Sequence, residues 1–410
     1  MTSLEAIGEK AKNAAYALEE CKCKNEALMA IAAALESRAD EILEANAIDL
    51  ENADKNGVPG PMLDRLRLDN ARICAMADGV RKVAELDDPI GEVKRMWKRP
   101  NGLVIGEKRV PLGVVAIIYE ARPNVTADAA ALCLKTSNSV ILRGGKEAIN
   151  SNIAIMKIMQ DAAYGAGVPE GSLNIIEDTS RETATALMRL SEYVDVLIPR
   201  GGKGLIKSVV ENATVPVIET AAGNCHVYIE KTADPAMAKE ILINAKVSRP
   251  SVCNACETVL IDEEFGNTDE LVNALIEHNV EVRVCERASK LYPHLPVATE
   301  DDWYKEYNDY IISLKLVKDS DEAIAHINRY NTKHSEAIVT NDYEISQKFL
   351  SRVDAAAVYV NASTRFTDGF EFGFGAEIGI STQKMHARGP MGLEALTSSK
   401  YIIYGEGQIR

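Results

Sequence analysis

The chain has 410 residues, too many for a single hydrophobic core, so we expect two or three domains. Its 61 acidic and 46 basic residues give a formal net charge of −15, which argues against nucleic acid or an anionic membrane as a partner, because both attract clustered Lys and Arg. Apolar residues make up 46% and charged residues 26% of the chain, as in ordinary soluble globular proteins.

Membrane and secretion signals are weak in this sequence. No stretch approaches the roughly 18–20 uninterrupted apolar residues of a membrane span. The charged start, MTSLEAIGEKAKNAA, lacks the apolar core of a signal peptide. The eight cysteines are scattered rather than spaced as a disulfide framework, so we expect a protein of the reducing cytoplasm.

The first part of the chain predicts helices and then a hairpin. Residues 1–86 are rich in Ala, Leu, Glu and Lys, with apolar positions at three- and four-residue spacing and a break at Gly57-Val-Pro-Gly-Pro61. Asn101-Gly102, between two extended runs, predicts a β-hairpin over residues 96–110. Such a hairpin protrudes from an α/β chain and is a natural dimer contact.

From residue 111 the pattern alternates between strands and helices. The expected strands are 114–119, 139–142, 173–176, 194–198 and 215–218, and the expected helices are 128–135, 149–165, 181–190 and 203–210. This alternation predicts a doubly wound parallel sheet, which binds ligands at the carboxyl ends of its strands. We expect residues 1–225 to form a cofactor-binding domain.

A second α/β run follows. Its expected elements are a helix over 235–246 and strands over 259–262, 280–285, 311–317, 336–340 and 356–360. The Gly-rich residues 368–380 predict a loop, and residues 399–404 a last strand that pairs with the hairpin. The fold class is therefore α/β, with a second doubly wound domain over 226–385, and a bridging element made of 96–110 and 386–410.

Two glycine-containing loops predict phosphate binding at strand ends. One is Arg143-Gly-Gly-Lys146, and the other is Pro199-Arg-Gly-Gly-Lys203-Gly, which precedes a helix. Glycines such as Gly201 and Gly202 let the main chain approach an anion, and a helix N-terminus adds N–H donors. Plain turn chemistry is the alternative, because the G-x-G-x-x-G and P-loop patterns are absent.

The segment SRPSVCNACET, residues 248–258, contains the candidate nucleophile. Pro250 blocks a continued helix and places Cys253 on a sharp loop. Arg249 would lower the thiol pKa, which favours a nucleophile over a merely buried cysteine. Cys256 has no second ligand pair for zinc and runs into a strand instead of opening a helix, so we expect it to be packing.

Three motifs carry a resemblance to a known family. Residues 217–224 read VIETAAGN, with Glu219 34 positions before Cys253; residues 317–338 read VKDSDEAIAHINRYNTKHSEAI; and the cysteine loop has the form Arg-Pro-x-x-Cys-Asn-Ala. By these motifs the chain resembles the aldehyde dehydrogenase superfamily, and within it the γ-glutamyl phosphate reductase (glutamate-5-semialdehyde dehydrogenase) family. The resemblance covers about residues 4–404.

The resemblance implies NADPH-dependent reduction of L-glutamyl 5-phosphate to L-glutamate 5-semialdehyde, with release of phosphate, in L-proline biosynthesis. The Cys253 thiolate would form a thioester, which accepts hydride far better than a carboxylate does. The oxyanion donors would be the Cys253 main-chain N–H and the amide of Asn124. Glu219 would relay protons or be structural, because no thioester hydrolysis is needed.

The resemblance also implies the cofactor contacts. At the strand end where the superfamily has Lys and then Glu for the adenosine ribose, this chain has Arg143 and Lys146. Because Lys attracts a 2′-phosphate that Glu would repel, we expect NADP(H) over NAD(H). Glu306 resembles the glutamate that holds the nicotinamide ribose; an exposed structural carboxylate is the alternative.

Several assignments stay open in the sequence. The substrate's amino-acid end could be held by Arg249, by Arg122 or by the 373–379 loop, and a base could come from His226 or His334. Aldehyde oxidation, a nicotinamide-free acyltransferase or hydrolase, and a non-catalytic binding role are the rival functions. We expect a homo-oligomer, a dimer or larger.

Overall fold

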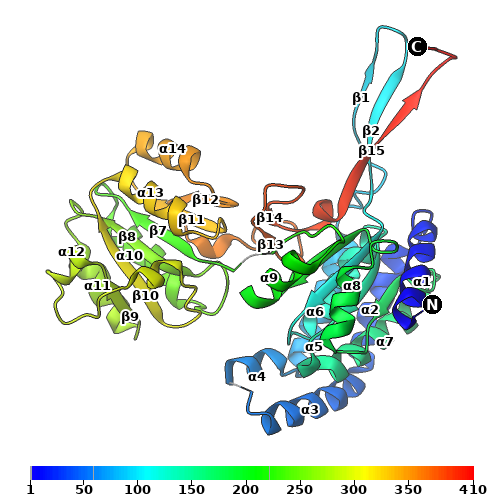
Figure 1. Ribbon diagram of the computed structural model, residues 1–410, viewed down its shortest axis with the longest axis horizontal. Helices are drawn as coiled ribbons and strands as arrows, with labels where there is room; N and C mark the ends of the chain where they lie inside the picture. Colours follow the sequence, from blue (N-terminus) through cyan, green and yellow to red (C-terminus); the bar gives the residue numbers. More distant parts are fainter. Residues whose placement is uncertain (1, 59, 221) are drawn as a thin grey trace. The chain divides into compact units, whose positions relative to one another are not determined.

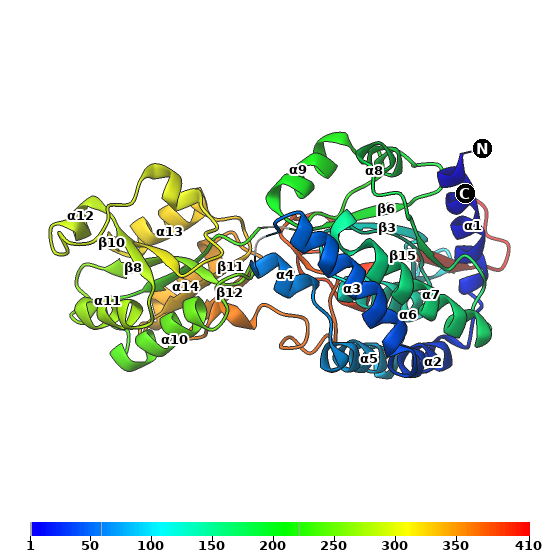
Figure 2. The ribbon, with the colours of Figure 1, turned by 90° about the horizontal axis from the view of Figure 1, so that it is seen from below.

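The computed structural model describes residues 2–58, 60–220 and 222–410. Pro59 of the predicted helix break and Ala221 of the VIETAAGN motif lie outside these residues. The chain forms two compact units, one of residues 1–219, 373–379 and 391–410 and one of residues 220–372 and 380–390 (Figures 1 and 2). The division falls a few residues before the boundary expected at 225, and the Gly-rich 373–379 loop belongs to the first unit.

The first unit begins with helices, as the sequence predicts for residues 1–86. They are α1 (Ser3–Leu18), α2 (Lys24–Ser37), α3 (Ala39–Lys55), α4 (Gly60–Leu66) and α5 (Asn70–Glu85). A capping box starts α1: the Thr2 hydroxyl accepts the N–H of Glu5, whose carboxylate accepts the N–H of Thr2. The α2 face that carries Leu28, Ile31 and Leu35 is fully buried, and α2 packs on α5 and α7.

The first unit's sheet is parallel, with strand order β5-β4-β3-β6. Its strands are β3 (Val114–Tyr119), β4 (Ser139–Arg143), β5 (Leu173–Ile175) and β6 (Val196–Arg200). They are connected by α6 (Asn124–Lys135), η1 (Lys146–Ala148), α7 (Ile149–Gly165) and α8 (Arg181–Met188), and α9 (Lys203–Asn212) follows β6. All of β3 is buried, as expected for a parallel strand covered on both faces. The strand order reverses between β3 and β6, where such sheets bind ligands.

One strand prediction for this unit, at residues 215–218, is wrong. Residues 215–218 make a single bridge, Leu197 with Val217, rather than a strand. Leu197 donates to the carbonyl of Pro216 and accepts from Ile218. Pro216 itself has no N–H to donate, so the ladder does not extend.

The predicted hairpin and tail pair as expected. Strands β1 (Val93–Lys98), β2 (Val104–Pro111) and β15 (Thr397–Tyr404) form an antiparallel sheet of order β1-β2-β15, which we call the hairpin sheet. Gly102 turns the hairpin with φ +90°, a conformation that favours glycine. In Figure 1 the red β15 runs beside the cyan β2. The short helix η4 (Leu393–Leu396) leads into β15.

The second unit has a parallel sheet of order β12-β11-β7-β8-β10-β9. The strands are β7 (Cys225–Ile229), β8 (Cys256–Asp262), β9 (Glu281–Val284), β10 (Ile311–Val317), β11 (Ser335–Val339) and β12 (Ala357–Val360). The helices are α10 (Pro235–Val247), α11 (Thr268–Glu277), α12 (Glu286–Ser289), η2 (Glu300–Tyr304), α13 (Ser320–Tyr330), α14 (Tyr343–Arg352) and η3 (Thr364–Phe366), and β13 (Ile380–Ser381) pairs with β14 (Gly389–Pro390).

Both faces of this second sheet are covered. The side chains of Val227 and Ile229 pack with α10 and α11, whereas Tyr228 packs with α13 and α14 on the other face. The expected doubly wound α/β architecture is therefore confirmed. The sequence pattern missed β7, whose run opens with the polar pair Cys225-His226 and not with apolar residues. Among the described residues, no helix is both long and apolar enough to cross a membrane.

Candidate active site

Cys253 lies where the sequence predicts, on a turn between α10 and β8. Helix α10 ends at Val247, before Pro250, and the half-buried Cys253 precedes the strand. The two ends of the loop are joined by a fully buried ion pair, Lys246 Nζ to Glu257 Oε2 at 2.6 Å. Burial raises the pKa of Glu257 to about 7, although Lys246 acts to lower it. The pair therefore braces both ends of the loop.

The segment before β7 packs directly on the main chain of Cys253. A Cβ added at Gly223 would lie 1.4 Å from the carbonyl oxygen of Cys253, so no other residue fits without moving the main chain. The thiol of Cys225 donates to the same carbonyl at 3.1 Å. The next-to-last residue of the VIETAAGN motif is thus the glycine that positions the cysteine loop.

Glu306 reaches the same segment. Its carboxylate accepts the N–H of Gly223 at 2.7 Å. The next residue, Asn224, is fully buried, and its amide donates to the carbonyls of Trp303 and Tyr330 at 2.7 and 2.9 Å. Asn224 ties the segment before β7 to the chain around η2 and the end of α13. Its role was missed because nothing in the local sequence indicates these partners.

These residues share one edge of the second sheet. The segments around Gly223, Cys253, Glu306 and His334 precede β7, β8, β10 and β11. Because these strands are parallel neighbours, their starts meet at one edge, here the amino-terminal edge. The candidate site of this unit therefore lies opposite the edge at which parallel sheets usually bind ligands.

A second loop clamps the cysteine loop. The side-chain amide of Asn254 donates to the carbonyls of Arg365 and Thr367 at 3.2 and 3.0 Å, and Thr364 donates to the carbonyl of Asn254 at 2.7 Å. The guanidinium of Arg365 donates through Nε to Ser248 Oγ at 3.1 Å and through Nη1 to the side-chain oxygen of Asn254. Sequence reasoning missed Arg365, since it lies in no motif and far from Cys253 along the chain.

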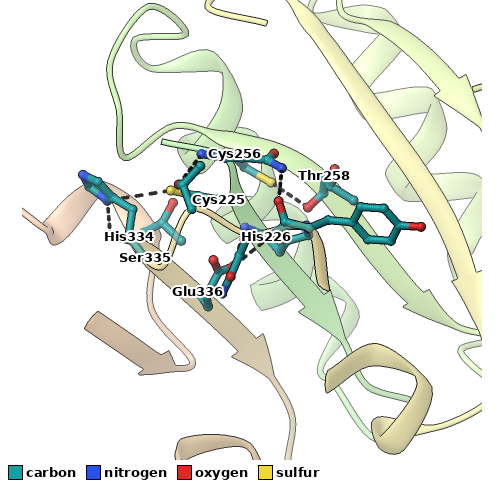
Figure 3. Close-up of polar contacts among 12 residues, drawn as sticks. Cys225, His226, Cys256, Thr258, His334, Ser335 and Glu336 are labelled. Atoms are coloured by element: carbon teal, nitrogen blue, oxygen red, sulfur yellow. Dashed lines mark hydrogen bonds and ion pairs between the residues drawn. The ribbon is translucent and has the colours of Figure 1, made fainter. Parts of the chain in front are cut away.

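The two histidines proposed as bases have other polar partners (Figure 3). His226 Nδ1 contacts Glu336 Oε2 at 3.0 Å, and the main-chain N–H of His226 donates to the same oxygen at 2.8 Å. His334 Nδ1 contacts Ser335 Oγ at 2.8 Å and Cys225 Sγ at 3.9 Å. All of these side chains are buried, and burial raises the pKa of Glu336 against the effect of His226. The His226–Glu336 pair is thus a buried polar contact between neighbouring strands β7 and β11 of the sheet.

Asn124, the expected oxyanion donor, is the first residue of α6 and is exposed. Its amide donates to Asp128 Oδ2 at 3.0 Å. Burial raises the pKa of Asp128 to about 6, although the hydrogen bond from Asn124 acts against the rise. Asn124 belongs to the first unit and Cys253 to the second, so their cooperation stays a prediction.

The two residues expected at the adenosine ribose behave differently. Arg143 Nη2 donates to the main-chain carbonyls of Thr179 and Ser180, the latter at 3.1 Å, and burial lowers the pKa of Arg143. Lys146 opens η1, is exposed, and has no polar partner among the described residues. Arg143 therefore holds the loop after β5, whereas Lys146 is available to a ligand.

The glycine loop before α9 already holds a negative group. The N–H of Gly202 donates to Glu120 Oε2 at 2.9 Å, and a Cβ at Gly201 would lie 2.7 Å from Glu120 Cδ. Glu120 follows β3 and the loop follows β6, at the reversal of strand order. The helix N-terminus attracts this carboxylate as it would a phosphate. Residues 201–202 therefore fit an anionic group of a cofactor.

The other expected site residues lie on accessible chain. Glu219 is half-buried and is the last residue of the first unit before the chain passes into the second. Arg249 is exposed on the cysteine loop, and Arg122 is half-buried before α6. Cys256 is fully buried, with its thiol donating to the carbonyl of Thr258 at 3.2 Å, so its expected packing role is confirmed.

The chain matches known proteins along its whole length. The Aldehyde dehydrogenase family matches residues 3–312. A gamma-glutamyl phosphate reductase of Clostridium perfringens is 63% identical over 98% of both chains, and one of Enterococcus faecalis is 58% identical over 100% of this chain and 99% of its own. The crystal structure of gamma-glutamyl phosphate reductase from Thermotoga maritima covers 100% of both chains with a TM-score of 0.97 and 48% identity.

A more distant solved structure shares the fold. An acetylating aldehyde dehydrogenase from Geobacillus thermoglucosidasius has a TM-score of 0.71 at 18% identity, over 99% of this chain and 97% of its own. The chain thus belongs to the aldehyde dehydrogenase family of oxidoreductases, and within it to the gamma-glutamyl phosphate reductases. The family expected from the sequence motifs is confirmed.

Proposed function

We propose that this enzyme reduces L-glutamyl 5-phosphate to L-glutamate 5-semialdehyde with NADPH, releasing phosphate, as a step of L-proline biosynthesis in the cytoplasm. The observation that carries the proposal is Cys253, which lies on a braced loop in a chain 63% identical, over 98% of its length, to a gamma-glutamyl phosphate reductase. A thiol on such a loop suits covalent acyl transfer.

In the proposed reaction the Cys253 thiolate attacks the carbonyl carbon of the acyl phosphate. A C–S bond forms, the C–O bond to phosphate breaks, and the electron pair of that bond leaves with the phosphate. The main-chain N–H of Cys253 and the amide of Asn124 would donate to the oxyanion of the tetrahedral intermediate. Glu219 would relay a proton or support the site, since this reaction needs no activated water to hydrolyse the thioester.

The residues of the first unit fit a nicotinamide cofactor. Lys146 would hold the 2′-phosphate of NADP, and Gly201 and Gly202 would face a phosphate in the place of Glu120. Glu306, which holds Gly223 beside Cys253, would bind the nicotinamide ribose. When bound, the cofactor supplies the hydride that brings the acyl group to the aldehyde level. The C–S bond would then break, and its electron pair would return to Cys253 as the thiolate. Lys146→Ala should raise the KM for NADPH about tenfold, the loss of one charge-assisted hydrogen bond, and leave that for NADH unchanged.

Reverse turnover tests the reaction. With glutamate 5-semialdehyde, phosphate and NADP⁺, the wild type should produce NADPH, and omission of phosphate should stop it. Cys253→Ala should lose about 10⁴-fold or more in kcat, because the nucleophile is gone. Cys256→Ala is the matched control, a buried cysteine three residues away, and should keep its turnover within a few-fold. Steady oxidation of the aldehyde without phosphate would contradict the proposal.

The proposal includes a homo-oligomer built through the hairpin sheet. This small sheet exposes the large side chains of Met96, Tyr401, Ile403 and Tyr404, of which the last three are each 60% exposed. Large exposed apolar groups on a narrow sheet favour contact with another chain.

A further inference from the structure

Two arginines at the cysteine loop make no ion pair with a carboxylate among the described residues. Neither Arg249 nor Arg365 makes an ion pair among the described residues, although the chain carries a net charge of −15 and other arginines do find carboxylates, such as Arg388 with Asp354 at 2.6 Å. Other arginines, such as Arg143, also make no ion pair among the described residues, but Arg249 and Arg365 lie together at the cysteine loop. They point to an anion that comes from outside the chain.

The position of Arg365 is set by the nucleophile's own loop. Its Nε donates to Ser248 and its Nη1 to Asn254, so the guanidinium joins residues on both sides of Cys253 in the sequence. Its Nη2 has no partner among the described residues. Arg365 therefore holds the loop through Nε and Nη1, and its Nη2 can donate to a ligand.

The electrostatics agree with this placement. Burial lowers the pKa of Arg365, the nearby charge of Arg249 lowers it further, and the charges of Cys253 and Asp368 raise it. The two guanidinium groups thus repel each other close to the thiol. A dianion bound between the two guanidinium groups would attract both of them and offset their mutual repulsion.

We propose that Arg365, together with Arg249, forms the phosphate subsite of the enzyme, which binds the phosphoryl group of the acyl phosphate and then the released phosphate. This inference rests on the proposed function. The phosphate is attached to the carbon that Cys253 attacks, so it must lie beside the cysteine loop. The substrate's α-carboxylate lies at the far end of its carbon chain. A guanidinium fork also suits phosphate and would stabilise the charge that develops as the C–O bond breaks.

Alkylation of Cys253 tests phosphate binding without any turnover. Cofactor-free enzyme is treated with iodoacetamide, a neutral reagent, and modification of the Cys253 peptide is followed by mass spectrometry with and without inorganic phosphate at constant ionic strength. Phosphate should slow the alkylation of the wild type. Arg365→Ala should lose this protection and Arg365→Lys should keep part of it, because Lys retains the charge but not the fork. Arg352→Ala, which removes an exposed arginine that pairs with Asp321, should keep full protection.

Reverse-direction kinetics identify which end of the substrate Arg365 serves. Arg365→Ala should raise the KM for phosphate about tenfold or more, the loss of a charge-assisted contact, and leave the KM for glutamate 5-semialdehyde within about twofold. A raised KM for the semialdehyde alone would assign Arg365 to the α-carboxylate and overturn the inference. A fall in kcat with both KM values unchanged would leave Arg365 a loop clamp only and overturn it too.

The two assays separate the inference from the function. A wild type that never turns over at any phosphate concentration refutes the proposed reaction, and the alkylation assay still decides whether Arg365 binds phosphate. A wild type that turns over but shows no protection by phosphate refutes the subsite alone. Arg365→Lys also guards against a folding defect, because its far-ultraviolet circular dichroism and melting temperature should match those of the wild type.

Discussion

At the scale of single residues, the site depends on a contact that leaves no room for a side chain. Gly223 lies against the main chain of Cys253, and the atoms it meets are carbonyl oxygen, carbonyl carbon and Cα. Main-chain atoms cannot rotate away as the end of a flexible side chain can. The position of Cys253, the proposed nucleophile, is therefore coupled to a residue 30 positions earlier in the chain.

Gly223→Ala should displace the cysteine loop. We expect kcat to fall about 100-fold, because a shift near 1 Å has that effect on catalysis. The free energy of unfolding should drop by about 1–3 kcal/mol from overpacking. Gly266→Ala is the matched control in the same unit, since nothing lies within 4 Å of its added Cβ. Wild-type kcat in Gly223→Ala would show that the loop tolerates the shift.

Asp128→Asn tests the pH dependence of the first unit. Burial raises the pKa of Asp128 from 3.8 to about 6, so the folded state holds this proton more tightly than the unfolded state does. The stability that this proton contributes is complete below about pH 4 and is lost as the pH rises through 6. The variant escapes this loss, so its stability relative to the wild type should increase by about 1–3 kcal/mol between pH 4 and pH 7. Urea unfolding at both pH values measures the difference, and an equal difference at both would contradict the assignment.

At the scale of elements, the Lys246–Glu257 pair links the last turn of α10 to the start of β8. Both side chains are completely buried. A charge left alone in such a place is costly, whereas an apolar pair of similar size is tolerated. The pair holds the two ends of the cysteine loop at a fixed separation.

Lys246→Met should therefore destabilise the enzyme by about 3–5 kcal/mol, because it leaves Glu257 buried without a partner. The double variant Lys246→Met/Glu257→Leu should recover most of that loss. Chemical denaturation of both proteins, with Lys239→Met as a control for an exposed ion pair on the same helix, measures the contrast. A double variant as unstable as the single one would show that the ion pair has a favourable net contribution.

At the scale of the whole molecule, the hairpin sheet is the part whose surface suits another copy of the chain. Tyr401 and Ile403 share one face of β15, where Tyr401 meets Trp97 edge-on at 6.2 Å between ring centroids. The strand is an exposed edge of its sheet, with β2 on one side only. An uncovered edge strand of this kind pairs readily with another chain.

Tyr401→Lys/Ile403→Lys should reduce the proposed homo-oligomer to monomers, because it places two charges on the apolar face. Light scattering coupled to size-exclusion chromatography measures the mass. Lys400→Ser, on the opposite face of the same strand, should leave the mass unchanged. An unaltered mass in the double variant would place the oligomer contact elsewhere.

Local pattern was sufficient for much of this protein. The alternation of apolar runs and helices predicted both sheets, Asn101-Gly102 predicted the hairpin, and Pro250 predicted the turn at Cys253, because each signal acts within a few residues. The same approach placed a strand at residues 215–218, where Pro216 limits pairing to one bridge, and missed β7, whose first residues are polar. The apolar content of a segment does not by itself show how many residues can pair with a neighbouring strand.

The tertiary structure decided which residues surround the nucleophile. Strand order, which no local pattern encodes, brings the starts of β7, β8, β10 and β11 to one edge, and so places Gly223 and Glu306 beside the cysteine loop. Arg365 reaches the same loop from η3, after β12. The tertiary structure also turned Arg143 toward main-chain carbonyls. The sequence was enough to identify the family and to select Cys253 as the candidate nucleophile, since motifs are local. The residues around Cys253 come together through contacts across as many as 111 residues of chain, and only the folded chain makes these contacts.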